Sequence, residues 1–207
     1  MYKVLVLFVT SVALFADSCG SAQPEINLDK TSPNGVYRVN VRLWQERVKG
    51  TLDYRDHIKV QYFKGQEVIG NYENQDEDQY ESSVREGTQV VEWLGDNVLR
   101  MGRDRSDQPF SDELIVSNNT HESLRHLGVS YGKYQSFRVF DIPPRSQVTL
   151  YASPEFKPDH TSNYSLGYGG QTQSGKTFEG TLNGKQRKSP ADGQLKFDIR
   201  IEPQDLR

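Results

Sequence analysis

The amino-acid sequence predicts an all-β protein, an antiparallel β-sandwich-like fold that follows a cleaved N-terminal signal segment. Three observations support this: short segments of alternating apolar and polar residues, frequent turn signals between them, and no long amphipathic helical window. Of the 207 residues, 34% are hydrophobic and 11% are aromatic. Because aromatic groups supply buried area that offsets the entropy cost of ordering, this composition indicates a folded chain with a polar surface.

The N-terminus has the pattern of a signal peptide. Lys3 supplies a short positive region, and residues 4–16 are apolar apart from Thr10 and Ser11. That run is too short to cross a bilayer as a helix, so we assign residues 1–22 to a signal peptide and leader and expect an exported protein of a bacterial periplasm or envelope.

The single cysteine, Cys19, lies just after this apolar run and resembles the acylated cysteine of bacterial lipoprotein signals. The resemblance implies a membrane partner through a lipid anchor on Cys19. Ala16 and Ser18 are small, as that pattern requires, whereas Asp17 departs from it. Ordinary cleavage after a small-x-small stretch is the alternative, and it yields a free exported protein. One cysteine cannot form an internal disulfide in either case.

The first strand of the mature chain is predicted at residues 36–44, after a polar leader at 20–30 and a Pro-Asn-Gly turn at 33–35. Its odd-numbered residues from Tyr37 to Leu43 are apolar and the even-numbered residues between them are polar, which is the period of a half-buried strand. Further strands are predicted at 58–63, 67–72, 89–93 and 98–101, with a hairpin turn at 95–97.

A polar stretch at 102–112 is the best candidate boundary, and it divides an N-terminal β unit at 29–103 from a C-terminal β-sandwich-like unit at 112–203. A single larger sandwich is the alternative. In the second unit strands are predicted at 113–117, 127–131, 136–140, 147–151, 165–168 and 194–201. Residues 122–126 are the one place where a helical turn is considered.

Two short stretches, Ser-Pro-Asn-Gly-Val-Tyr-Arg-Val at 32–39 and Glu-Trp-Leu-Gly-Asp-Asn-Val-Leu at 92–99, carry a family resemblance. They are similar to a turn-and-strand module of uncharacterised exported bacterial proteins and lipoproteins, over about a third of the chain. The resemblance implies a fold element and export, and it implies no activity.

Residues 170–177 match the phosphate-loop pattern, from Gly170 through Lys176 to Thr177. Phosphate binding requires a helix to begin at the lysine, because the first amides of that helix hold the phosphates. Gly180, Gly184 and Pro190 follow, and they do not favour that helix. We therefore predict a Gly/Ser-rich hairpin loop and no nucleotide cofactor.

Residues 128–132 match the G-x-S-x-G elbow of serine hydrolases around Ser130. An elbow needs a helix after the serine and a downstream acid and histidine. The residues that follow read as another strand, and only His160, beside Asp159, lies downstream. A serine in a strand or turn is the preferred interpretation, and we assign no catalytic residue.

The histidines show neither a thiolate partner nor a His-Glu-x-x-His motif, so no metal site is assigned. The acidic run at 76–78 could offer oxygen ligands to calcium but lacks the spacing of an EF-hand loop. We interpret it as a solvated hairpin tip.

Two classes of function remain open. A net charge of -3 gives no indication of the strongly basic face that nucleic-acid binding requires, so we expect no nucleic-acid partner. The first class is a non-catalytic envelope protein that binds a protein or glycan partner, with Trp44, Trp93 and the tyrosines of the second half as a possible aromatic platform or as core residues. The second class is a secreted hydrolase.

Overall fold

The structure, a computed structural model, describes residues 25–51, 54–75, 89–103, 112–132, 135–153, 165–183 and 194–207. The signal segment predicted at 1–22 and Cys19 lie outside the described residues. The chain is all-β, as predicted. Its strands are β1 (Ile26–Thr31), β2 (Tyr37–Arg47), β3 (Tyr54–Lys64), β4 (Glu67–Gln75), β5 (Gln89–Trp93), β6 (Val98–Arg103), β7 (Asp112–Asn118), β8 (Leu124–Tyr131), β9 (Gln135–Ile142), β10 (Ser146–Ala152), β11 (Ser165–Thr172), β12 (Thr177–Asn183) and β13 (Lys196–Ile201), followed by the short 3-10 helix η2 (Pro203–Asp205).

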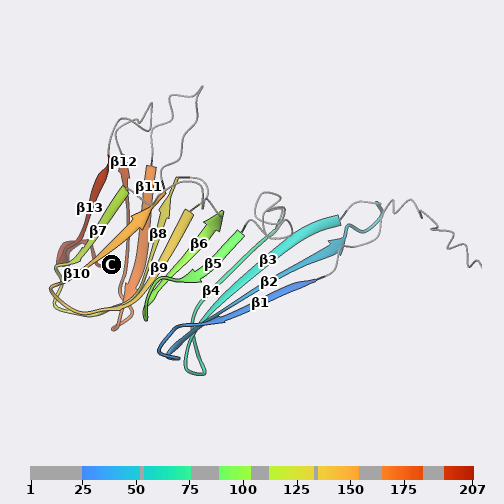
Figure 1. The fold of residues 1–207 in the computed structure, drawn as a ribbon, viewed down its shortest axis with the longest axis horizontal. Helices are drawn as coiled ribbons and strands as arrows, with labels where there is room; N and C mark the ends of the chain where they lie inside the picture. The colour runs from blue at the N-terminus through green and yellow to red at the C-terminus, as the bar shows by residue number, and fades with distance from the viewer. Residues whose placement is uncertain are drawn as a thin grey trace, which may run out of the picture.

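The described strands form three sheets, in the orders β1-β2-β3-β4, β12-β11-β8-β9-β6-β5 and β10-β7-β13. The six-stranded sheet lies between the other two, because its two faces contribute to two separate hydrophobic cores. Figure 1 shows the four-stranded sheet as a layer that projects to one side of the sandwich. The described pairs are antiparallel except for β13 with β7, which run parallel.

Alternation along the sequence produces these strands. In β2 the residues from Tyr37 to Leu43 are buried at every second position, and in β13 Phe197, Ile199 and Ile201 alternate with exposed residues. Successive side chains of a strand point to opposite faces, so each such strand buries one face and leaves the other in contact with water.

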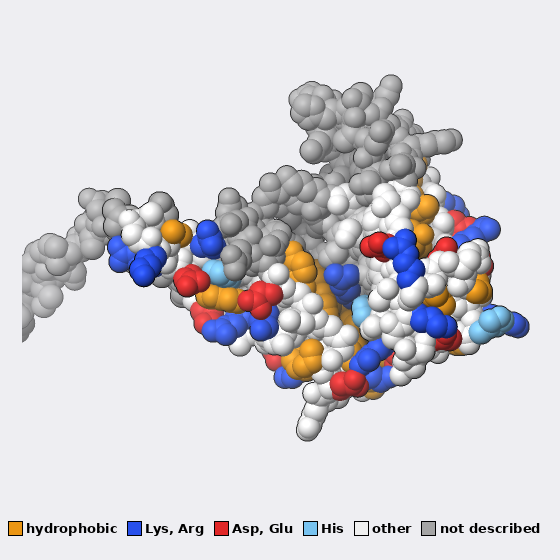
Figure 2. Space-filling model, turned by 180° about the vertical axis from the view of Figure 1, so that it is seen from behind, with side chains coloured by type: hydrophobic (Ala, Val, Ile, Leu, Met, Phe, Trp, Pro, Cys, Tyr) orange, Lys and Arg blue, Asp and Glu red, His pale blue; other side chains and the backbone are white. Residues whose placement is uncertain are grey.

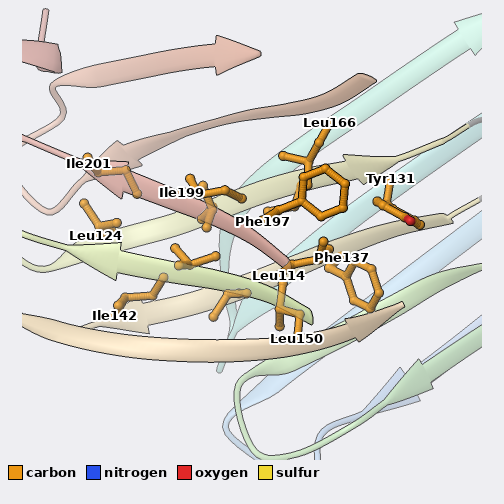
Figure 3. Packing of buried hydrophobic residues seen from close by; sticks show 14 of the residues in the cluster. Leu114, Leu124, Tyr131, Phe137, Ile142, Leu150, Leu166, Phe197, Ile199 and Ile201 are labelled. Atoms are coloured by element: carbon orange, nitrogen blue, oxygen red, sulfur yellow. The ribbon is translucent and has the colours of Figure 1, made fainter. Parts of the chain in front are cut away.

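The sandwich core lies between the three-stranded and six-stranded sheets (Figure 3). Leu114 and Leu150 come from one sheet, and Tyr131, Phe137 and Leu166 come from the other, all nearly or fully buried. The hydroxyl of Tyr131 donates a hydrogen bond to Asp112, whose other oxygen accepts one from the backbone amide of Leu195. The buried carboxylate is therefore satisfied from both sides.

A second core joins the other face of the six-stranded sheet to the four-stranded sheet. Phe140 of β9 is at its centre: its ring centroid lies 4.9 Å from that of Tyr37, 5.8 Å from that of Tyr62 and 5.9 Å from that of Trp93. Aromatic rings at these separations attract one another in addition to the area that they bury. The two sheets are therefore held together mainly by apolar contact.

Polar links border this second core. Tyr37 donates a hydrogen bond of 2.5 Å to the carboxylate of Asp141, which is also paired with Lys64. Burial raises the pKa of Tyr37, and the bond to Asp141 raises it further. Arg125 of β8 pairs with Glu67 of β4. These contacts connect β2 and β3 to β9 and β4 to β8, and so hold the four-stranded sheet in place on the six-stranded sheet.

The structure departs from the sequence-based expectations in three places. Residues predicted as a polar leader form β1, residues 177–183 form the unpredicted β12, and residues 124–126, considered for a helical turn, begin β8. The sheets also do not divide at the polar stretch 102–112. Strands β5 and β6 precede that stretch but pair into the six-stranded sheet with β9.

Candidate functional site

A cleft of about 390 Å³ lies between the edge of the four-stranded sheet and the adjacent face of the six-stranded sheet. Figure 2 shows a hollow between the two bodies of the molecule, with basic and histidine side chains deep inside it and hydrophobic side chains beside them. Its walls come from β3 and β4 on one side and from β8, β9, β11 and β12 on the other. The lining residues are Tyr62, Ile69, Gly70, Asn71, Tyr72, His126, Arg138, Phe140, Gly169, Gly170, Gln171 and Thr177.

The floor of the cleft is set by one row of residues across the six-stranded sheet. Arg138 of β9 lies opposite Gly128 of β8, Gly128 lies opposite Gly169 of β11, and Gly169 lies opposite Glu179 of β12. The side chain of Arg138 crosses β8 at the glycine, since a Cβ atom on Gly128 would lie 1.4 Å from its Nη1 atom. The guanidinium of Arg138 can therefore occupy this position only because residue 128 is a glycine.

Arg138 is a half-buried cation without a carboxylate partner among the described residues. Its Nε donates a hydrogen bond of 3.2 Å to the hydroxyl oxygen of Tyr62, and its guanidinium carbon lies 5.7 Å from the centre of that ring. Glu179, three strands away in the same row, has Arg207 Nη1 3.2 Å from its Oε1. The Arg138 charge at the cleft is thus not neutralised by the part of the chain that is described.

His126 of β8 lies beside this arginine. Its Nδ1 atom is buried and lacks a hydrogen-bond partner in the described structure. Burial lowers the pKa of His126, and the charges of Arg138 and then Arg125 lower it further. The imidazole is therefore neutral near pH 7, which leaves it able to donate or accept a hydrogen bond.

Three aromatic residues line the cleft: Tyr62 and Tyr72 come from the four-stranded sheet, and Phe140 comes from the same strand as Arg138. Tyr62 and Phe140 are buried, and Tyr72 of β4 is 43% exposed at the opening. Asn71, Gln171 and Thr177 add amide and hydroxyl groups to the lining. A cleft with apolar rings and a few polar groups is the usual composition of a small-molecule site.

Sequence reasoning did not identify the Arg138–His126 pair, because Arg138 read as an ordinary polar position of a strand and His126 fell in the segment 122–126 considered for a helical turn. The glycines were the available signal. A glycine inside a strand often marks the close approach of another group, and Gly128 and Gly169 both lie in strand interiors.

The phosphate-loop match forms a β-hairpin, as the sequence suggested. Residues 170–172 end β11, residues 173–175 turn with Gly175 at φ 94°, and β12 begins at Thr177. Lys176 Nζ lies 2.6 Å from Oε1 of Glu122. Hydrogen bonds from Lys176 and then Ser174 lower the pKa of Glu122 to about 2. The lysine stabilises a turn in this arrangement.

The serine of the elbow match lies exposed on β8, and the following residues form β9. His126 is four residues away from Ser130 on the same strand, a separation of about 13 Å. The imidazole therefore cannot take the hydroxyl proton of Ser130. Asp159 and His160 lie outside the described residues.

The aromatic residues considered for a platform are dispersed. Trp93 packs at the second core and donates a hydrogen bond from Nε1 to the carbonyl of Lys30, whereas Trp44 stacks on His57 at 5.0 Å. Tyr131 is buried and Tyr151 is exposed on β10. Tyr134 and Tyr164 lie outside the described residues.

Across the described ranges, no three His, Cys, Asp or Glu side chains gather in a way that could hold a metal ion. The acidic run at 76–78 is outside them. Nor does any described segment form a helix of the length and apolarity needed to span a membrane. We found no family model, curated protein or solved structure that matches the chain.

Proposed function

We propose that the chain is a non-catalytic binding protein and that its ligand site is the cleft between the four-stranded and six-stranded sheets. The observation that carries the proposal is the cation of Arg138, which lines a hollow between two layers with no carboxylate partner in the described structure. Burying part of a charge is unfavourable unless something pairs with it, and a bound ligand would supply the missing partner.

The ligand class that fits the lining is a glycan or another small polar molecule. Tyr72 presents exposed ring surface, whereas Tyr62 and Phe140 line the cleft but are almost fully buried. Amide and hydroxyl side chains are distributed around them. Sugars are bound in this way, because their C–H faces pack on rings while their hydroxyls form hydrogen bonds. No nucleophile–base pair of the serine-hydrolase type is assembled at Ser130 within the described residues, which favours binding over hydrolysis.

The binding site is tested by NMR titration of the isotope-labelled protein with cellotetraose, chitotetraose and tetragalacturonate. We expect at least one of them to shift the amide signals of Tyr72, His126, Arg138 and Gly169, because these residues line the cleft. Shifts confined to the outer face of the four-stranded sheet, around Trp44, would place the site elsewhere. Binding of none of the three would contradict a glycan-binding role.

The same samples separate binding from hydrolysis. Mass spectrometry after prolonged incubation should recover each tetrasaccharide intact. Shortened products that disappear with Ser130→Ala would instead identify the hydrolase that the elbow match suggested.

We further propose that the protein is exported and held at the bacterial envelope through Cys19. The support is the apolar run at 4–16 followed by a cysteine at position 19. The intact mass of the protein purified from membranes of its host should equal a chain that starts at Cys19 plus acyl chains. A bare chain that starts near Gln23 would show ordinary cleavage and a free exported protein.

A further inference from the structure

We infer that the ligand of the cleft is an acidic sugar whose carboxylate is bound by the guanidinium of Arg138. This inference rests on the proposed function and adds the chemical class of the ligand. It is argued from the charge, the geometry and the surroundings of Arg138.

The charge around the cleft floor is positive although the whole chain carries -3. Arg138 and Arg125 are both close enough to His126 to affect its ionisation. Arg125 is neutralised by Glu67 across the layers, whereas Arg138 has no ion pair in the described part of the chain. A positive group in a hollow with low-dielectric walls concentrates anions there.

The position of Arg138 leaves its two terminal nitrogens, Nη1 and Nη2, available to a ligand in the cleft. Nε is occupied by the hydroxyl of Tyr62, which fixes the plane of the group, and Nη1 rests over Gly128. The terminal nitrogens donate no hydrogen bond to a described residue. Two N–H groups of one guanidinium match the two oxygens of a carboxylate, and such charge-assisted pairs are stronger than neutral hydrogen bonds.

The part of the cleft next to the guanidinium of Arg138 suits a sugar ring with hydroxyl groups. Gly169 continues the floor without a side chain, and Tyr72 faces it from β4. Gln171 and Asn71 supply amide groups at the margins of the same cleft. A small anion alone would leave these amide groups and the exposed ring of Tyr72 without contacts, whereas a sugar acid offers a ring and hydroxyls that can contact both.

The inference is tested with two probes that differ only in the carboxylate, methyl β-D-glucuronide and methyl β-D-glucoside. Dissociation constants come from NMR titration of the cleft amides. We expect the glucuronide to bind at least about tenfold more tightly, because the glucoside lacks the charge-assisted hydrogen bonds. Arg138→Gln should abolish the difference between the two sugars, so that the glucuronide binds no more tightly than the glucoside.

Two further variants distinguish recognition from general charge. Gly128→Ala keeps the charge but puts a methyl group where Nη1 lies, so it should also weaken the glucuronide about tenfold. Arg38→Gln is the matched control: Arg38 also lies over an aromatic ring, Phe63 at 4.2 Å, but on the outer face of the four-stranded sheet. It should leave both affinities unchanged. Dispersed amide spectra of each variant confirm that it is folded.

The outcomes separate the two proposals. If both sugars shift the cleft amides with equal affinity, the cleft binds ligands and the acidic-sugar inference is wrong. The inference is also wrong if inorganic phosphate binds more tightly than the glucuronide, since the site then selects another anion. If the glucuronide, the glucoside and the tetrasaccharides all leave the cleft signals unmoved, the proposed function fails as well.

Discussion

Replacing Asn118 with aspartate is expected to lower the free energy of unfolding by about 3–5 kcal/mol at pH 7. The side chain is fully buried, and its Nδ2 donates to the carbonyls of Glu122, Ile142 and Pro143 at 2.9, 3.1 and 2.9 Å. Its Oδ1 accepts from the backbone amide and the hydroxyl of Thr120. Asn118→Asp places a carboxylate oxygen against three carbonyl oxygens and removes both donors.

The pH dependence of this deficit provides a second readout. Burial and the facing carbonyls raise the pKa of the introduced carboxyl above the ordinary value of about 3.9. The folded state then binds more protons than the unfolded state between the two values, so stability falls as the pH rises through that window. Urea denaturation should show the smallest deficit at the lowest pH and the largest at neutral pH.

The control is the same substitution, asparagine to aspartate, at the neighbouring residue Asn119. Asn119 is exposed and donates to Glu202 from the surface, so Asn119→Asp should cost less than about 1 kcal/mol. Equal losses for the two variants would contradict the role of the Asn118 network.

The second large effect is expected at Gly170, the first glycine of the phosphate-loop match. A Cβ atom there would lie 2.3 Å from the carbonyl oxygen of His126, 2.7 Å from Cζ of Phe178 and 3.1 Å from Cα of Leu127. Two of these atoms belong to the backbone of the neighbouring strand and cannot move aside as a flexible side chain would. Gly170→Ala should therefore lower the free energy of unfolding by about 3 kcal/mol in a denaturant titration.

Gly167 is the matched control on the same strand. A Cβ atom at Gly167 meets no described atom within 4 Å. Gly167→Ala should leave stability unchanged or raise it by up to about 1 kcal/mol, because alanine loses less backbone entropy on folding. If Gly170→Ala is as stable as the parent, close packing is not the reason for this glycine.

The strands were predictable where apolar residues alternate without interruption. Both β2 and β13 were predicted because every second residue is apolar, and a strand that buries one face requires that pattern. The strand β1 was missed because only Ile26 and Leu28 are apolar in it, and it is an edge strand defined by its pairing with β2. The strand β12 was missed because Gly180 interrupts it. Its pairing with β11 depends on Tyr168 lying over that glycine.

The candidate site was not predictable from the sequence. Arg138 follows the same alternation as any solvent-facing residue of a strand, and His126 lies in the segment 122–126 that was considered for a helical turn. Whether such a side chain is exposed to solvent or covered by a second sheet depends on which strands pair into the same sheet and how the sheets pack. The pairing of β5 and β6 with β9, across the polar stretch that was expected to divide the chain, is a long-range choice.

The sequence by itself determined the all-β class and the strands with uninterrupted alternation, such as β2 and β13, because the period of two and the turn residues act between neighbours along the chain. It also determined the hairpin at 170–177, since its glycines and proline oppose the helix that phosphate binding needs. Only the tertiary structure decided that the polar face of β8 and β9 is partly covered by the four-stranded sheet. That covering produces the cleft, because Phe140 anchors the two layers while Gly128 and Gly169 leave space beside it for the cation of Arg138.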